Sequence, residues 1–155
     1  MVRHVGMSSR IPSLVSIGYE GRTVDELVRQ LIDNEVDVLV DVRLTPLSRR
    51  RGLSKHQLSA ALAAAGIDYI HHRALGNPRD NRDGFRSGKL ASLARFRTDV
   101  LSTDDAQRAI SHVVELLDGG VVALLCFERE HEECHRHLVV EQVQRRVPTV
   151  LVVEI

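Results

Sequence analysis

Both cysteines of the chain fall in one short segment, which reads Cys126-Phe-Glu-Arg-Glu-His-Glu-Glu-Cys-His-Arg136. The segment also holds four glutamates, two histidines and two arginines. Such side chains can act as nucleophiles, general acids or bases, metal ligands and anion binders. An apolar run, 121–125, precedes the segment, and a helical pattern begins at His137. Ligands of α/β proteins bind where buried strands end, so we expect a functional site here.

Cys126 directly follows the apolar run, a position that thiolate enzymes use because loop amides and a helix N-terminus lower a thiol pKa. The nearby glutamates, beginning with Glu128, oppose thiolate formation. Three roles stay open for Cys126: a nucleophile, a buried residue that finishes a core strand or lines the site, and a metal or redox group.

Metal binding is the next chemistry to weigh, and five residues in the segment can ligate an ion: Cys126, Glu128, His131, Cys134 and His135. Seven residues separate the two cysteines, whereas zinc-binding cysteine pairs are typically about two to four apart. The spacing therefore assigns no metal ligand, and any cofactor is left open. A Cys126–Cys134 disulfide, which would act as a redox switch, is a further alternative.

Cys134, His135 and Arg136 open the next predicted helix. Free backbone N–H groups and the positive end of the helix dipole favour anions at such a position. Arg136 adds a bidentate donor, and His135 adds a group that titrates near neutral pH. We interpret this helix start as an anion site, although polar residues also commonly tolerate a helix start without any ligand.

A second polar pair, Asp41 and Arg43, ends another predicted strand. A buried carboxylate is costly unless it is paired, and residues two apart on a strand point to one side. Asp41 could orient a partner or act as a base while Arg43 binds an anion, or the two could form a structural ion pair. The basic loop that follows contains Ser48 and Arg49 and could attract phosphate groups.

Apolar strand patterns and helical patterns alternate along the chain. The expected strands are 14–18, 36–42, 67–70, 121–125 and 149–153, with capping boxes predicted at Thr23 and Ser54 and a long polar loop up to Gly88. Alternation predicts a single three-layer α/β domain over residues 13–155, with a mostly parallel sheet of about five strands and helices on both faces. The strands' carboxyl ends should then meet at one edge, where the polar residues converge.

The composition is that of an ordinary globular protein, with 43% hydrophobic and 27% charged residues and a formal net charge of zero. Residues 1–12 are expected to form a flexible tail. Two cysteines without an export signal predict a reducing cytoplasm, and no apolar run predicts a membrane span. Residues 43–86 carry nine basic and three acidic residues, which can mark an interaction face or a solvated surface.

Five motifs, in order, resemble the domain-of-unknown-function 488 family: 17–21, 39–46 with Ser48 and Arg49, Tyr69 with 75–76, 124–128, and 134–136. The resemblance covers residues 13–153, and the family has no settled activity. It implies that the site lies at Gly18, Asp41, Arg43, Pro46, Ser48, Arg49, Cys126, Glu128, Cys134, His135 and Arg136. The acidic stretch before Cys134 departs from the pattern. A looser similarity to rhodanese-like domains rests on an Asp-Val-Arg strand end and a later cysteine, without their tight cysteine loop.

Together these patterns favour an enzyme that acts on an anionic, phosphate-bearing small molecule or nucleic acid. The expected catalytic residues are Cys126, Glu128, Asp41 and His135, and the expected substrate-binding residues are Arg43, Ser48, Arg49, Cys134 and Arg136. Two alternatives stay open: a non-catalytic nucleic-acid-associated module, and a thiol or metal sensor built on Cys126 and Cys134. The substrate and the oligomeric state do not follow from the sequence.

Overall fold

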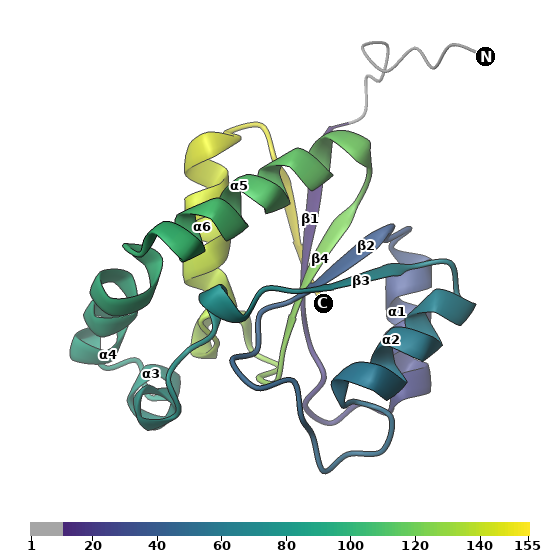
Figure 1. The fold of residues 1–155 in the computed structure, drawn as a ribbon, viewed down its shortest axis with the longest axis horizontal. Coiled ribbons are helices and arrows are strands. Elements are labelled where there is room, and N and C mark those ends of the chain that lie inside the picture. Colours follow the sequence, from purple (N-terminus) through teal and green to yellow (C-terminus); the bar gives the residue numbers. More distant parts are fainter. Residues whose placement is uncertain (1–10) are drawn as a thin grey trace.

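The computed structural model describes residues 11–155 and shows one twisted sheet of five parallel strands (Figure 1). The strands are β1 (Ser13–Gly18), β2 (Val38–Asp41), β3 (Asp68–His71), β4 (Val122–Cys126) and β5 (Leu151–Glu154). Their order in the sheet is β3-β2-β4-β1-β5. The predicted parallel α/β architecture is confirmed, and β4 lies at its centre.

Helices cover both faces of the sheet (Figure 1). The helices are α1 (Val24–Asp33), α2 (Lys55–Ala64), α3 (Arg82–Arg86), α4 (Leu90–Arg95), α5 (Asp104–Gly119) and α6 (Arg136–Arg146). Because neighbouring strand residues point to opposite faces, Leu14 packs in the core that contains α5 and α6 residues. Val15 packs in the other core, with residues of α1 and α2. Both cores are apolar, as expected for strands covered on both sides.

Of the two capping boxes predicted at helix starts, the structure has one. Thr23 forms the predicted capping box, because its hydroxyl accepts from the Glu26 amide and the Glu26 carboxylate accepts from the Thr23 amide. The capping box predicted at Ser54 was wrong. Its hydroxyl instead accepts from the Ser48 amide at 2.9 Å, and Gln57 accepts from the amide of Gly52. Ser54 therefore fixes the basic loop rather than the helix.

The long polar segment before Gly88 was predicted as a loop but contains short helices. Turns Arg73–Leu75 and Arg79–Asn81 precede α3. Asn81 is buried and donates to the Asn77 side chain at 2.9 Å, and Phe85 packs in the core. These contacts hold the segment in a defined conformation, which its polar composition did not predict. A π-helical turn, Phe96–Leu101, then continues α4.

The carboxyl ends of β1, β2 and β4 lie side by side, which positions the site. Tyr19, just after β1, donates its amide to the Cys126 carbonyl at 3.2 Å, and Val42, just after β2, donates to the Leu125 carbonyl at 3.0 Å. Most of the predicted tail lies outside the described residues, but Pro12 accepts a hydrogen bond from Leu151. Within residues 11–155, no helix has the length and apolarity that a membrane crossing requires.

Candidate functional site

Four buried polar residues meet at the end of the central strand: Cys126, Glu128, Cys134 and His135. One side-chain atom from each, a sulfur, a carboxylate oxygen or a ring nitrogen, lies within 4.8 Å of every other. Cys126 ends β4, and His135 immediately precedes α6, so the strand and the helix hold the two halves of the cluster. The chain between them turns back over a short 3-10 helix, His131–Glu133.

A backbone contact fixes the orientation of the His135 ring. Its Nε2 lies 2.8 Å from the Val42 carbonyl oxygen, which can only accept, so Nε2 carries a hydrogen. In the neutral ring the Nδ1 lone pair then faces both sulfurs, 3.8 Å from Cys126 and 3.6 Å from Cys134. Both cysteines are free thiols. The Phe96 ring packs against the imidazole with a centroid separation of 5.3 Å and shields it from water.

Glu128 is held in place by charge and by a close backbone approach. Its carboxylate accepts from Arg86 Nη2 at 2.9 Å. A Cβ on Gly18 would come within 1.9 Å of the Glu128 carbonyl oxygen, so a glycine is needed at the end of β1. Glu20 adds a further tie by accepting from the Arg129 amide at 3.0 Å.

The cluster's groups shift one another's proton affinities. The neighbouring Cys134 thiol, together with His135, lowers the pKa of Cys126 well below its ordinary value despite burial. Burial and the hydrogen bond to Cys126 raise the pKa of Cys134. Burial alone would lower the pKa of His135, but the Cys126 charge raises it. Burial raises the pKa of Glu128, yet Arg86 and Cys134 outweigh it and the pKa is lowered. Cys126 is thus the more acidic of the two thiols.

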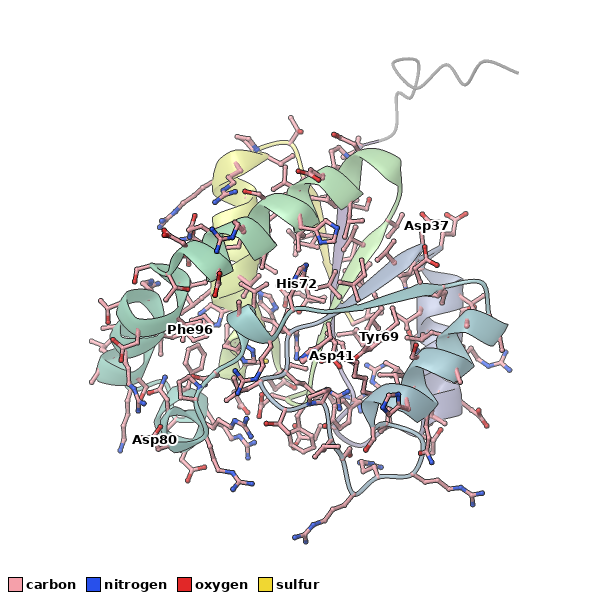
Figure 2. All side chains as sticks on the ribbon, viewed as in Figure 1. Asp37, Asp41, Tyr69, His72, Asp80 and Phe96 are labelled. Atoms are coloured by element: carbon pink, nitrogen blue, oxygen red, sulfur yellow. The ribbon has the colours of Figure 1, made fainter. Side chains whose placement is uncertain are left out.

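The Asp41–Arg43 pair is fully buried beside the cluster. Arg43 donates through Nε and Nη2 to the Asp41 carboxylate at 2.9 and 2.7 Å, which is a bidentate ion pair. Tyr69 donates its hydroxyl to the same carboxylate at 2.5 Å, and Figure 2 shows Asp41 and Tyr69 close together. Burial and Asp41 both raise the pKa of Tyr69. Arg43 Nη1 donates to the Leu53 carbonyl at 2.8 Å.

Arg136 lies inside the protein with no exposed surface. Its Nε donates to the Ser16 hydroxyl at 2.8 Å, and among residues 11–155 neither terminal nitrogen has a hydrogen-bond partner. Its backbone amide donates to Cys134 Sγ at 3.5 Å. The role predicted for Arg136 in substrate binding stays a prediction, and its buried guanidinium does not line the cavity described next.

A cavity of about 190 Å³ opens onto the cluster. Of the predicted site residues, Cys126, Glu128, His135 and Arg43 line it. Asp41, Cys134 and Arg136 are buried and do not line it. Ser48 and Arg49 line a second hollow of about 600 Å³ formed by residues 46–57, and Leu47 lines both. The structure thus brings together the strand-end residues, and Ser48 and Arg49 lie in the adjoining hollow rather than in the cavity.

Two arginines that sequence reasoning did not single out also line the cavity, Arg82 and Arg86. Arg82 donates through Nε to the Asn77 carbonyl at 3.4 Å. Arg86 stacks over Phe127, with its guanidinium carbon 5.8 Å from the ring centroid, while it pairs with Glu128. Both belong to the basic stretch 43–86, and that charge excess was the only signal pointing to them.

Comparison with known proteins places these residues in a family. The family model described as "Domain of unknown function DUF488" matches residues 23–143, which is most of the chain. The chain belongs to the DUF488 family. The DUF488 match includes the whole Cys126–Arg136 segment and the Asp41–Arg43 pair, but its description names no activity. No curated protein and no solved structure matches the chain. The looser rhodanese similarity stays an expectation.

Proposed function

We propose that this DUF488 protein is an enzyme that binds an anionic, phosphate-bearing substrate in the cavity and acts on it with the buried cluster. One observation carries the proposal: a single cavity has Cys126, Glu128 and His135 in its wall together with three arginines. Arginine recognises phosphate and carboxylate oxygens by paired hydrogen bonds. Reactive side chains and anion-binding side chains therefore face the same space.

The arginines differ in how free they are to bind a ligand. Arg43 already donates to Asp41 and to the Leu53 carbonyl. Arg86 pairs with Glu128, yet 45% of its side chain is exposed. Among the described residues, no hydrogen bond engages the terminal nitrogens of Arg82. Arg82 is therefore the first candidate to contact the anion, with Arg86 beside it.

The size of the cavity limits what it can enclose. Its volume of about 190 Å³ is below the roughly 300–1,000 Å³ that pockets for drug-sized ligands occupy. The enclosed part of the substrate is therefore small, such as a phosphate group and the atoms next to it. Cys126 and His135 are placed for nucleophilic or acid–base work on that group, and Glu128 is placed for proton transfer. Two free thiols suit a reducing compartment such as the cytoplasm.

The test is anion binding by Arg82→Ala. Inorganic phosphate and nucleoside monophosphates should raise the Tm of the wild-type protein, and the variant should bind them about tenfold or more weakly because it loses a charged hydrogen bond of about 1.5–3 kcal/mol. Arg79→Ala, which removes an exposed arginine outside the cavity, is the matched control. Equal binding by all three proteins, or no binding at all, would refute the proposal.

The basic loop favours a second candidate function, binding of nucleic acid without chemistry. Arg49, Arg50 and Arg51 are all exposed beside the hollow of residues 46–57. Oligonucleotide binding that weakens steeply with salt, and that weakens further when all three arginines are changed to alanine, would favour this function. Aromatic residues make up only 3% of the chain, which argues against recognition of single strands by base stacking.

A further inference from the structure

We propose that Cys126, Glu128, Cys134 and His135 form a binding site for one divalent transition-metal ion of the zinc class. The site stands on its own geometry. The role we give the ion, at the wall of the substrate cavity, rests on the proposed function. The long spacing between the cysteines argued against a metal in the sequence, because short cysteine spacings arise where one tight turn supplies both ligands. Here β4 and α6 bring the ligands together, so the length of the connecting loop sets no limit.

The distances within the cluster fit tetrahedral coordination. Zinc binds sulfur at about 2.3 Å and nitrogen at about 2.0–2.1 Å. In a tetrahedral site a sulfur ligand and a nitrogen ligand therefore lie about 3.5 Å apart. The sulfurs of Cys134 and Cys126 lie 3.6 and 3.8 Å from His135 Nδ1. All four candidate ligand atoms lie within 4.8 Å of one another, and a carboxylate oxygen of Glu128 completes the set.

The surroundings of the cluster also match those of a metal centre. A ligating histidine characteristically donates its other ring N–H to a carbonyl or carboxylate, and His135 Nε2 is 2.8 Å from the Val42 carbonyl. The Arg136 amide donates to Cys134 Sγ, a contact that stabilises a thiolate ligand. Phe96 packs on the imidazole and keeps the ligands in an apolar setting.

The charges of the loaded site would balance, because binding of the ion displaces the protons of both thiols. Two thiolates and one carboxylate would place three negative charges in a buried space, which is costly without compensation. A divalent ion together with Arg86, which pairs with Glu128 at 2.9 Å, matches those charges. Two thiolates and an imidazole are soft or borderline ligands, so the site suits Zn²⁺ and disfavours Mg²⁺ and Ca²⁺.

The ion would border the substrate cavity. Cys126, Glu128 and His135 all line that cavity, while Cys134 is buried and does not. Four protein ligands fill a tetrahedral shell, so the ion would polarise a phosphate oxygen or activate a water molecule only by taking a fifth ligand or by exchanging Glu128 for it. The cysteines would then serve as ligands, and neither would be free to act as a nucleophile.

The first experiment measures the metal content of the full chain, expressed in zinc-supplemented medium and purified without chelator. We expect about one zinc ion per wild-type chain, and at least a tenfold loss of bound zinc in Cys134→Ser and in His135→Gln. Glu132→Gln removes an exposed acid two residues from Cys134 and should keep the full content. Wild-type protein with no stoichiometric transition metal that also fails to take up added Zn²⁺ would overturn the proposal.

A second measurement guards against variants that fail to fold. Wild-type protein stripped by a chelator should bind Co²⁺ and show the thiolate-to-cobalt charge-transfer absorption and the intense visible bands of a tetrahedral site. Added Zn²⁺ should displace that spectrum, raise the Tm, and protect both thiols from a thiol-specific reagent. Cobalt bound without a thiolate band, or thiols that stay reactive in excess Zn²⁺, would show that the cysteines are not ligands.

The two proposals fail in different ways. Stoichiometric zinc with no Tm response to inorganic phosphate or to nucleoside monophosphates would support the metal site and refute the proposed function. Phosphate binding that depends on Arg82, in a protein that takes up no zinc, would refute the metal site and leave the proposed function standing.

Discussion

Asp41 and Arg43 are two residues apart and almost fully buried, and together they tie β2 to the cavity wall. Asp41 accepts hydrogen bonds from Arg43 and from the Tyr69 hydroxyl. Arg43 uses its remaining nitrogen on the Leu53 carbonyl and lies over the Tyr19 ring. Because each charge is matched and hydrogen-bonded, the pair can sit in the interior, where either charge alone would be costly. It also holds the loop that follows β2 against the site.

Removing one charge of this pair should lower the stability of the protein strongly. Asp41→Asn leaves the Arg43 guanidinium buried without a counter-charge, and we expect the free energy of unfolding to fall by about 3–5 kcal/mol. Urea denaturation measures the loss. Asp68→Asn changes an exposed aspartate on β3 and should shift stability by no more than about 0.5 kcal/mol. Similar values for both variants would mean that the ion pair adds no stability.

At the scale of elements, β1 and β4 meet closely enough that the backbone itself shapes the site. The carbonyl of Glu128 passes where a side chain on Gly18 would stand. Tyr19 and Glu20 donate their amides to the carbonyls of Cys126 and Phe127, so the paired backbone continues past the strand ends. The position of Glu128 in the cluster therefore depends on a glycine, Gly18, at the end of β1.

Gly18→Ala tests this close approach. The added methyl group would meet the Glu128 carbonyl oxygen at 1.9 Å, and backbone atoms must move to admit it. We expect a loss of about 1–3 kcal/mol or more in the free energy of unfolding, together with reduced zinc binding. Gly119→Ala is the control, because no atom lies within 4 Å of its added carbon. The argument fails if Gly18→Ala is as stable as the control and binds zinc as the wild type does.

The sequence predicted elements well where a local pattern determines them. Apolar runs marked the strands, and Thr23 with Glu26 marked the start of α1. Ser54 misled the prediction because its hydroxyl accepts from the amide of Ser48, in the preceding loop, instead of from an amide of α2. The convergence of Arg43 with Cys126 and Glu128 followed from the expected parallel strands. Arg82 lines the cavity, and Arg136 is buried away from it. Both positions depend on side-chain packing, which no local pattern encodes.

At the scale of the whole molecule, a histidine pair joins the sheet to a covering helix. His72, just after β3, lies with Nε2 2.8 Å from Nδ1 of His112 on α5. Figure 2 shows His72 in the middle of the fold. Burial and then the neighbouring rings His112 and His71 lower the pKa of His72. Protonation of both rings of the pair would place two cations in contact.

This pair predicts a loss of stability in acid. Because the folded pKa of His72 is below its ordinary value of 6.5, the unfolded chain binds the proton more readily. Stability is therefore full above about pH 6.5 and is lost as the pH falls below it. Urea midpoints at about pH 7.5 and about pH 5.5 should differ less in His72→Gln than in the wild type. His56→Gln, an exposed histidine on α2, should keep the wild-type difference. If the urea midpoint changes equally between the two pH values in all three proteins, the pair has no role in the loss of stability.

The central place of β4 sets the order in which this protein can assemble during synthesis. β4 pairs with β1 on one side and with β2 on the other, joining Leu14 to Val122 and Val38 to the same residue. Until the ribosome has made residue 126, β1 and β2 each present an edge that lacks its β4 partner. Such long-range pairing slows folding and prolongs the exposure of aggregation-prone strand edges. Nascent chains of this protein should therefore depend on chaperones more than local helix-rich chains do.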